Sequence, residues 1–407
     1  MRDTPASPSF WRSPLRGPWF TSVLGLVLLV GITALFVTGL VSYAAYNPGL
    51  APVNDKTPDK GILGFYLFAW PTDPHWLYRL TQGVHVTLGV TLIPVLLAKL
   101  WSVVPKLFAL PPARSLTHAL ERVSLLLLVG GGLFEFVTGV LNVQLDYLFP
   151  GSFYPLHFYG AWVFFAAFVA HAVLKVPAAV RNVRRAREEG ELVAPRPDPP
   201  TVSRRGALWF VGGGSLLLFG TTAGQSFDGP LRRTALLAPH GGADPGTGPN
   251  GFQINKTAAY AGIDRAETAE EAWRLVVVGR SGRTVRLSRA ELAQLPLHSS
   301  ALPIACVEGW STSDQWWRGV RLRDLAALVG HDGDPPDVLV ESLQRRGAFR
   351  HAALRANQVA DPRSLLALYV NGEALSADHG YPARVIVPAA PGVLNTKWVA
   401  RLTFGKV

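Results

Sequence analysis

The chain has 407 residues, of which 49% are hydrophobic and 16% are charged, with a formal net charge of +11 at pH 7. Its single cysteine, Cys306, excludes an internal disulfide, and it excludes an iron–sulfur cluster or thiolate zinc site built by this chain alone. The basic excess lies largely in loops between apolar stretches, so it sets membrane topology and indicates no nucleic-acid partner.

Five apolar stretches approach or exceed the roughly 20 helical residues needed to cross a hydrocarbon core about 30 Å thick. They are Trp19–Tyr46, Leu80–Val104, Val123–Val143, His157–Val176 and Ala207–Ala223. We predict an all-α bundle of four transmembrane helices in residues 1–180 and a fifth transmembrane or signal-anchor helix in residues 207–224.

Positive charges are distributed unevenly over the connections between these stretches. The predicted cytoplasmic side carries Arg2, Arg12, Arg16, Lys99, Lys106, Arg114, Arg122, Arg181, Arg184, Arg185, Arg187, Arg196, Arg204 and Arg205, against Lys56, Lys60 and Arg79 opposite. Because positive loops stay in the cytoplasm, we expect a multi-pass protein of the cytoplasmic membrane, with its N-terminus inside and the region after Ala223 outside.

Histidines occur inside the predicted helices, where ionisable residues are rare and usually functional. His157 and His171 are 14 residues apart, or about 21 Å and nearly four turns, so they share a helix face. His85 and His157 are predicted to bind an outer haem iron, and His118 and His171 an inner one. Alternatively, some of these histidines only form hydrogen bonds at helix ends.

The four helices resemble the bundle of membrane b-type cytochromes that exchange electrons with quinones, over roughly residues 19–180. The resemblance implies one or two haems b and a quinone or quinol partner. Glu135 lies near the middle of the third helix, where a lone carboxylate is costly unless paired or protonated. It is either a proton relay or haem-edge contact, or a neutral acid bonded to a neighbouring helix.

A basic linker, residues 181–206, ends in Ser203-Arg204-Arg205-Gly206 ahead of the fifth apolar stretch. This sequence resembles a twin-arginine export signal placed inside the chain, which predicts the export machinery as a partner. The alternative is a basic stop at the edge of an ordinary helix. Residues 195–203 are rich in proline and are predicted to be a flexible linker.

Residues 225–407 have a different pattern, with strand-like alternations such as Trp273–Val278 and Arg384–Val387 and short helical stretches such as Leu322–Val329. This pattern predicts an extracytoplasmic α+β domain. Cys306 in this domain has three interpretations from its residue type: a metal ligand, a buried packing residue or a nucleophile, although no histidine base lies close to it in sequence.

Three stretches of this domain resemble the sulfite-oxidase-like molybdopterin family, including the methionine sulfoxide reductase catalytic subunits. They are Pro303–Trp310 with Trp317–Val320, Phe252–Thr257, and the region from Val370 through Asp378–Arg384 to Thr396–Val399. The aromatic pair typical of those reductase subunits is not in residues 252–257, which weakens that particular assignment.

The resemblance implies that Cys306 binds molybdenum directly, and a soft thiolate suits such a metal. We expect the molybdopterin cofactor to be bound by Asn255, Lys256, Thr257, His379, Arg384 and Lys397, since cations and amide donors suit an anionic cofactor. Tyr381 and Arg384 are further expected to line the substrate pocket.

Together the two parts predict a membrane oxidoreductase that passes electrons between quinone, haem and an external molybdenum centre and performs oxygen-atom transfer. The substrate is predicted to be a small-molecule or protein-bound sulfoxide such as methionine sulfoxide. One alternative is oxidation of sulfite or a related anion, with electrons leaving through the haems. The other is a non-catalytic cytochrome or assembly module that has lost its metal.

Overall fold

The structure is a computed structural model of the chain. It describes residues 11–50, 53, 68–105, 115–143, 153–187, 189–190, 192–193, 202–227, 229–237, 246–347 and 349–405, apart from the side chains of residues 117, 118 and 121. The predicted flexible linker at residues 195–203 therefore lies largely outside the described residues. The chain forms two compact units, each described by itself below.

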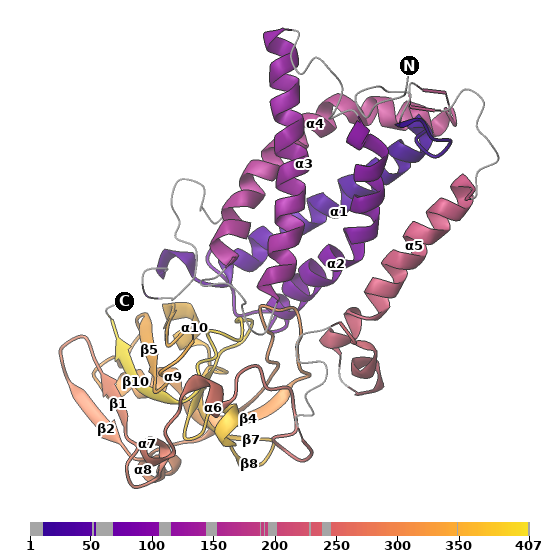
Figure 1. Ribbon diagram of the computed structural model, residues 1–407. Coiled ribbons are helices and arrows are strands. Elements are labelled where there is room, and N and C mark those ends of the chain that lie inside the picture. Colours follow the sequence, from indigo (N-terminus) through magenta and orange to yellow (C-terminus); the bar gives the residue numbers. More distant parts are fainter. Residues whose placement is uncertain are drawn as a thin grey trace. The chain divides into compact units, whose positions relative to one another are not determined.

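The first unit takes in residues 1–37, 85–142 and 156–222. Its helices are α1 (Pro18–Ala44), α2 (Leu77–Val103), α3 (Leu116–Asn142), α4 (Tyr154–Arg184) and α5 (Arg204–Gly220) (Figure 1). Helix α4 continues well beyond its predicted end at Val176, because its last turns are polar and carry Arg181 and Arg184. Helix α5 starts at the two arginines, where the Ser203 hydroxyl caps it by accepting from the Gly206 amide at 3.0 Å.

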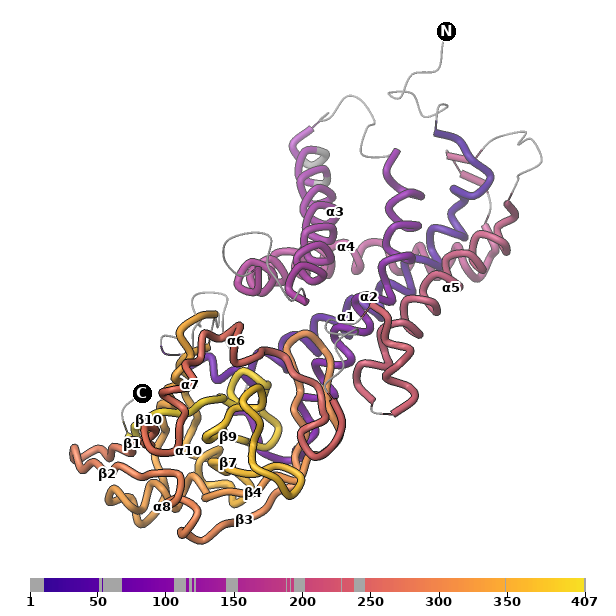
Figure 2. Tube along the Cα trace, turned by 60° about the horizontal axis from the view of Figure 1, so that its bottom comes forward, coloured from indigo at the N-terminus to yellow at the C-terminus, as the bar shows by residue number. Residues whose placement is uncertain are grey.

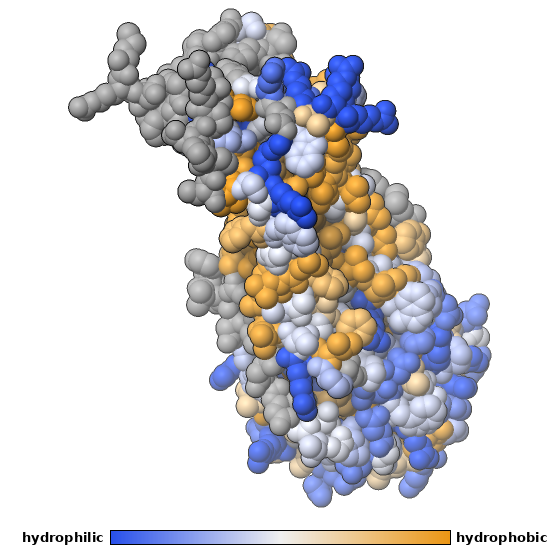
Figure 3. All heavy atoms as spheres, turned by 90° about the vertical axis from the view of Figure 1, so that its right-hand side faces the viewer, coloured by the Kyte–Doolittle hydropathy of each residue, from blue (hydrophilic) through white to orange (hydrophobic). Residues whose placement is uncertain are grey.

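Apolar side chains from α1, α2 and α4 make the core of this unit, with Phe20, Leu24, Leu92, Phe164 and Phe168 all buried. Five helices among the described residues are long and apolar enough to cross a membrane, with mean hydropathies from 1.3 to 2.6. Much of the outward surface of these helices is also apolar, as Figure 3 shows. A hydrophobic exterior is what lipid contact requires, and the predicted helical membrane region is compatible with it.

The second unit contains residues 38–84, 143–155 and 223–407. One five-stranded sheet has the order β2-β1-β10-β5-β6, and the other has the order β3-β4-β7-β8 with β9 also paired to β7. Only β1 and β10 pair in parallel among the described strands. Figure 2 shows β9, β7, β4 and β3 side by side. These sheets confirm the α+β prediction for the C-terminal region.

The strands are β1 (Leu275–Val278), β2 (Thr284–Leu287), β3 (His298–Leu302), β4 (Gln315–Arg321), β5 (Val338–Ser342), β6 (His351–Leu354), β7 (Leu365–Val370), β8 (Glu373–Ala374), β9 (Arg384–Ile386) and β10 (Val399–Phe404). The short helices are α6 (Ala258–Ala261), α7 (Arg265–Thr268), α8 (Arg289–Gln294), α9 (Leu322–Ala327) and α10 (Ala356–Ala360). Single 3-10 turns occupy Pro48–Leu50, Ala223–Ser226, Gly229–Thr234 and Ala377–His379.

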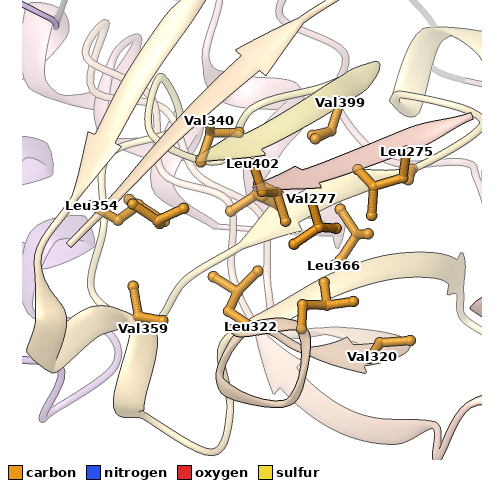
Figure 4. Close-up of a cluster of buried hydrophobic side chains, with 14 of the residues drawn as sticks. Leu275, Val277, Val320, Leu322, Val340, Leu354, Val359, Leu366, Val399 and Leu402 are labelled. Carbon is orange, nitrogen blue, oxygen red and sulfur yellow. The ribbon is translucent and has the colours of Figure 1, made fainter. Parts of the chain in front are cut away.

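Valine and leucine side chains from both sheets fill the core of the second unit (Figure 4). Leu275, Val277, Val340 and Leu402 of the first sheet meet Leu366 of the second, and all five are fully buried. A smaller cluster places Cys306 and Trp310 against Phe252 and Trp317. The sheets therefore supply a rigid base for the loops that carry the predicted site.

The second unit also incorporates chain from the connection between α1 and α2. Tyr46, Trp70 and Tyr78 are buried in one cluster with Ala305 and Ala389. The predicted domain boundaries place these N-terminal residues in the membrane region, because their only sequence signal is that they lie close to apolar helices in the chain. Their burial against residues 305 and 389 is a long-range contact that no local pattern encodes.

Gly319 of β4 leaves no room for a side chain against β7, and this yields a stability prediction. A Cβ on Gly319 would lie 2.0 Å from the Leu366 carbonyl oxygen of the neighbouring strand. We expect Gly319→Ala to lower the free energy of unfolding by about 3 kcal/mol, because the strands must separate. Thermal unfolding of the detergent-solubilised chain measures this loss.

Gly333→Ala is the matched control, because nothing lies within 4 Å of a Cβ at that position. Equal unfolding temperatures for the two variants would contradict the packing of β4 on β7.

Candidate functional site

A tight turn, residues 306–310, presents the cysteine and is called the Cys306 turn below. The Cys306 amide donates to the Trp310 carbonyl at 2.9 Å, and the Gly309 amide donates to the Cys306 carbonyl at 3.1 Å. Gly309 has φ +92°, a conformation that side chains disfavour, so the turn requires glycine. The turn directs the thiol inward, and Cys306 is only 3% exposed.

The thiol of Cys306 lies beside a carboxylate, whose negative charge opposes formation of the thiolate. Its Sγ lies 3.5 Å from Oε2 of Glu308, which also accepts from the indole N–H of Trp310 at 2.7 Å. Burial, together with the charge of Glu308, raises the pKa of Cys306 well above its usual value. A raised pKa opposes the nucleophile interpretation, since reactive thiols have lowered values. A coordinated metal would remove the proton outright.

Two cationic side chains are buried near this thiol. Arg384, at the start of β9, is 2% exposed, and Lys397 is 8% exposed. The Nζ atom of Lys397 donates to the carbonyl oxygens of Lys256 and Asp378, at 2.8 and 2.7 Å. Burial lowers the pKa of Lys397, the charge of Arg384 lowers it further, and the charge of Asp378 raises it.

Burial also lowers the pKa of Arg384 to about 9, so the guanidinium still carries its charge at neutral pH. Burial and the charges of Arg384 and Lys397 together lower the pKa of His379 to about 3, which keeps that imidazole neutral. The ring of His379 stacks on Phe252 at 3.8 Å between centroids, and its Nε2–H donates to the Asn250 carbonyl at 2.8 Å.

Several buried polar atoms around these cations have no hydrogen-bond partner within the described part of the chain. They are Nε of Arg384, Nδ2 of Asn395 and Oγ1 of Thr396. Arg384 donates one long hydrogen bond, 3.4 Å to the His379 carbonyl, although a guanidinium has five N–H donors. Buried charges and donors without partners are costly, so this donor set fits an anionic group bound beside Cys306.

The structure brings Lys256, His379, Arg384 and Lys397 together as the sequence predicted for a cofactor site. Tyr381 packs partly buried against the Cys306 cluster, with the guanidinium of Arg289 5.2 Å from its ring centroid.

Two predicted cofactor residues are less engaged in this cluster. Asn255 is half-buried in the loop before α6. Thr257 uses its hydroxyl to cap α6, accepting from the Tyr260 amide at 3.1 Å. Because this hydroxyl already has a structural role, its contribution to cofactor binding stays a prediction.

The sequence reasoning gave no role to three residues that shape the site: Glu308, Asp378 and Asn395. Glu308 contacts the thiol, and Asp378 accepts from the Ala258 amide at 2.8 Å, which ties the Lys397 region to α6. Asn395 accepts from the Val387 amide at 2.8 Å and leaves its amide nitrogen buried. All three lie beside or within the motifs that carry the family resemblance. Their polar side chains at these positions were the signal that could have identified them from the sequence.

Two of the predicted haem ligands face each other in the first unit. The rings of His85 and His157 are 6.2 Å apart between centroids and nearly perpendicular. The two rings are close enough for both imidazoles to ligate one metal ion.

Each ring also has its Nδ1 atom engaged by protein. Nδ1 of His85 donates to the Leu35 carbonyl at 3.0 Å, and Nδ1 of His157 lies 3.0 Å from the Thr138 hydroxyl. Metal-ligating histidines commonly hold the second ring nitrogen in this way, which would direct Nε2 of each ring to the metal.

Glu135 lies beside the same pair, with Oε2 3.1 Å from Nδ1 of His157. Of the two contacts to this nitrogen, the Thr138 oxygen has the geometry of a hydrogen bond, whereas the carboxylate is close without good alignment. The side chain of His118 lies outside the described residues, so its predicted pairing with His171 stays a prediction.

No group of three or more His, Cys, Asp or Glu side chains among the described residues could hold a metal ion.

Comparison with known proteins identifies the C-terminal domain. Residues 261–407 match the family described as the oxidoreductase molybdopterin binding domain. Mitochondrial sulfite oxidase of Rattus norvegicus is 32% identical over 158 residues, 33% of this chain and 29% of the relative. The uncharacterised oxidoreductase YuiH of Bacillus subtilis is 31% identical over 134 residues, 33% of this chain and 66% of the relative.

Among solved structures, the sulfane dehydrogenase SoxCD from Paracoccus pantotrophus aligns with 24% identity and a TM-score of 0.30, covering 33% of this chain and 39% of that one. The chain thus spans less than a third of the rat enzyme and about two thirds of the Bacillus protein.

The buried guanidinium yields a prediction about cofactor binding. Arg384→Met keeps the side-chain volume while removing the charge, so the chain should retain less molybdopterin. In cells that cannot make the cofactor, the same variant should unfold at a higher temperature than the wild type, because an uncompensated buried charge is lost. Pterin content and thermal unfolding measure the two effects.

Arg345→Met is the matched control, since Arg345 is 57% exposed and paired with Glu267. It should change neither quantity appreciably, as surface ion pairs contribute about 0–1 kcal/mol. A higher unfolding temperature in Arg384→Met with full cofactor retention would contradict the anion-binding role.

Proposed function

Because residues 261–407 are an oxidoreductase molybdopterin binding domain related to that of sulfite oxidases, we propose that the chain is a membrane-bound molybdenum oxidoreductase that reduces a sulfoxide such as methionine sulfoxide. The observation that carries the proposal is a buried thiol, Cys306, beside two buried cations, Arg384 and Lys397. A thiolate ligand and an anion-binding cluster are together what a molybdenum–pterin cofactor requires.

Bound molybdenum supplies two-electron oxygen-atom transfer, in which a sulfoxide, two electrons and two protons give a sulfide and water. The residues of this chain would hold and orient the cofactor. Cys306 provides the protein thiolate, while Arg384 and Lys397 neutralise the anionic cofactor. His379, neutral and stacked on Phe252, offers a fixed imidazole at the pterin side. Tyr381 is proposed to border the substrate pocket.

We propose that His85 and His157 bind a haem b that takes single electrons from a quinol. Support comes from their facing rings and from the hydrogen bonds that hold Nδ1 of each. Thr138 would then orient His157 as the partner of its second ring nitrogen, with the carboxyl group of Glu135 close by. A second haem on His118 and His171 remains part of the proposal on sequence grounds.

The membrane location is supported by the five apolar helices. The sidedness, with the N-terminus in the cytoplasm and the molybdopterin domain outside, is supported by the loop charges alone. Export of a domain that folds around its cofactor in the cytoplasm would use Arg204 and Arg205 as the recognition signal. Ser203 places both at the first turn of α5.

Sulfite is the second candidate substrate, because the rat relative is a sulfite oxidase. In that direction the protein would release electrons to quinone through the haem. The non-catalytic alternative requires a domain without molybdenum, and the retained Cys306 turn and cation cluster argue against it.

The haem proposal predicts that His157→Ala loses the b-type absorbance of the purified chain, because one of the two residues that would hold the haem iron is removed. His75→Ala is the control, since His75 lies outside the helices and pairs with Asp314. Optical spectra with haem extraction measure the outcome. An unchanged haem content in His157→Ala would refute the assignment of this ligand.

The substrate proposal predicts that methionine sulfoxide rapidly reoxidises haem that a quinol analogue has reduced under anaerobic conditions. Cys306→Ser should abolish this reoxidation while the haem spectrum stays unchanged, because only the molybdenum ligand is altered. No reoxidation in wild-type protein that contains molybdenum would exclude methionine sulfoxide. Reduction of the haem by added sulfite would then establish the opposite direction.

A further inference from the structure

The Cys306 turn is held by a segment far from it in sequence. Residues 70–83, from the connection between α1 and α2 and the first turns of α2, reach the backbone on both sides of Cys306. They lie in the same compact unit as residues 223–407, but outside the region that matches the molybdopterin family, residues 261–407.

The side of the turn that precedes Cys306 is held through Ala389. The indole N–H of Trp70 donates to the Ala389 carbonyl at 2.7 Å, and the Ala389 amide donates to the His75 carbonyl at 3.0 Å. Three residues later, the Gly392 amide donates to the carbonyl of Ala305 at 2.7 Å. Trp70 is 1% exposed, so its hydrogen bond is shielded from water.

The side that follows Cys306 is held by the start of α2. The side-chain amide of Gln82 donates to the Val307 carbonyl. The Ser226 hydroxyl donates to the Gly309 carbonyl at 3.3 Å, and Arg79 in turn donates to the Ser226 carbonyl at 2.6 Å. A Cβ on Gly83 would lie 3.1 Å from the Ser226 hydroxyl oxygen, so the helix approaches this point closely.

Other contacts dock the same segment independently of the Cys306 turn. The Asn357 side chain donates to the Trp70 carbonyl at 3.0 Å. Arg363 pairs with Asp73 at 2.7 Å and donates to the Thr72 carbonyl at 3.2 Å. These contacts anchor the segment to the domain without involving the Cys306 turn. The other contacts of the segment can therefore hold the turn in a fixed position.

We propose that residues 70–83 are a positioning element for the metal-binding thiol, with Trp70 and Gln82 as its positioning residues. The proposal rests on Cys306 being the molybdenum ligand of the proposed function. Groups that orient a metal ligand change metal affinity or activity by about 10–100-fold when they are removed. In this chain the connection between two membrane helices performs that task.

The experiment uses the full chain and the fact that Cys306 is its single cysteine. Trp70→Phe keeps the ring and loses the indole N–H, and Gln82→Met keeps the length and loses the amide. Trp76→Phe is the matched control, since Trp76 is in the same segment and 44% exposed. Cofactor-free protein is treated with N-ethylmaleimide and the alkylation rate is followed by mass spectrometry. Cofactor-loaded protein is examined by the electron paramagnetic resonance of Mo(V).

We expect Trp70→Phe and Gln82→Met to be alkylated at least about tenfold faster than wild type and to shift the Mo(V) resonance, with Trp76→Phe unchanged in both. Unchanged alkylation rates, or faster alkylation with an unaltered Mo(V) resonance, would overturn the proposal. If Trp70→Phe fails to fold, Gln82→Met alone decides. If even wild type binds no molybdenum, the proposed function fails, and the alkylation rates still decide whether the segment holds the turn.

Discussion

Positive charge buried without an ion-pair partner in the described part of the chain is the constraint on which the second unit depends. Arg384 and Lys397 are almost fully shielded from water, and Nδ2 of Asn395 and Oγ1 of Thr396 beside them lack partners among the described residues. Such an arrangement costs stability unless an anion fills it. The unfavourable free energy of these buried charges would be relieved when a negatively charged cofactor binds beside Cys306, the one thiol of the chain.

The packing of the two sheets compensates for the cost of these buried charges. Strand β9 places Arg384 over Trp317 of β4, with the guanidinium carbon 5.4 Å from the ring centroid. The valine and leucine core that packs against these strands is buried. A well-packed core can compensate for a strained, charge-rich site, because its burial supplies most of the folding free energy. The site is therefore built on loops and strand ends, while the strand centres hold the fold.

The helical unit also buries polar side chains. Its core is apolar, and two of its buried polar side chains, Thr138 and Glu135, both lie within 3.1 Å of one ring nitrogen of His157. Polar groups in such surroundings persist where each has a partner or a function. A histidine pair oriented by carbonyl, hydroxyl and carboxylate neighbours is suited to bind a metal, whereas a histidine that merely capped a helix would need no facing partner.

Hydrophobic runs and strand-like alternations are local signals, so the apolar helices and the change to an α+β domain near residue 225 could be predicted from the sequence. The roles predicted for the cofactor-site residues stay predictions. The sequence also placed Leu322 at the start of a helix and Arg384 at the start of a strand, as the structure has them. Only the tertiary structure decided what surrounds these residues. The contact of Glu308 with the thiol, the lack of an ion pair to Arg384 among the described residues, and the hydrogen bonds of Trp70 and Gln82 to residues beyond 300 depend on chain segments that meet only after folding. Burial and long-range pairing are properties of the packed molecule, so no local pattern could have revealed them.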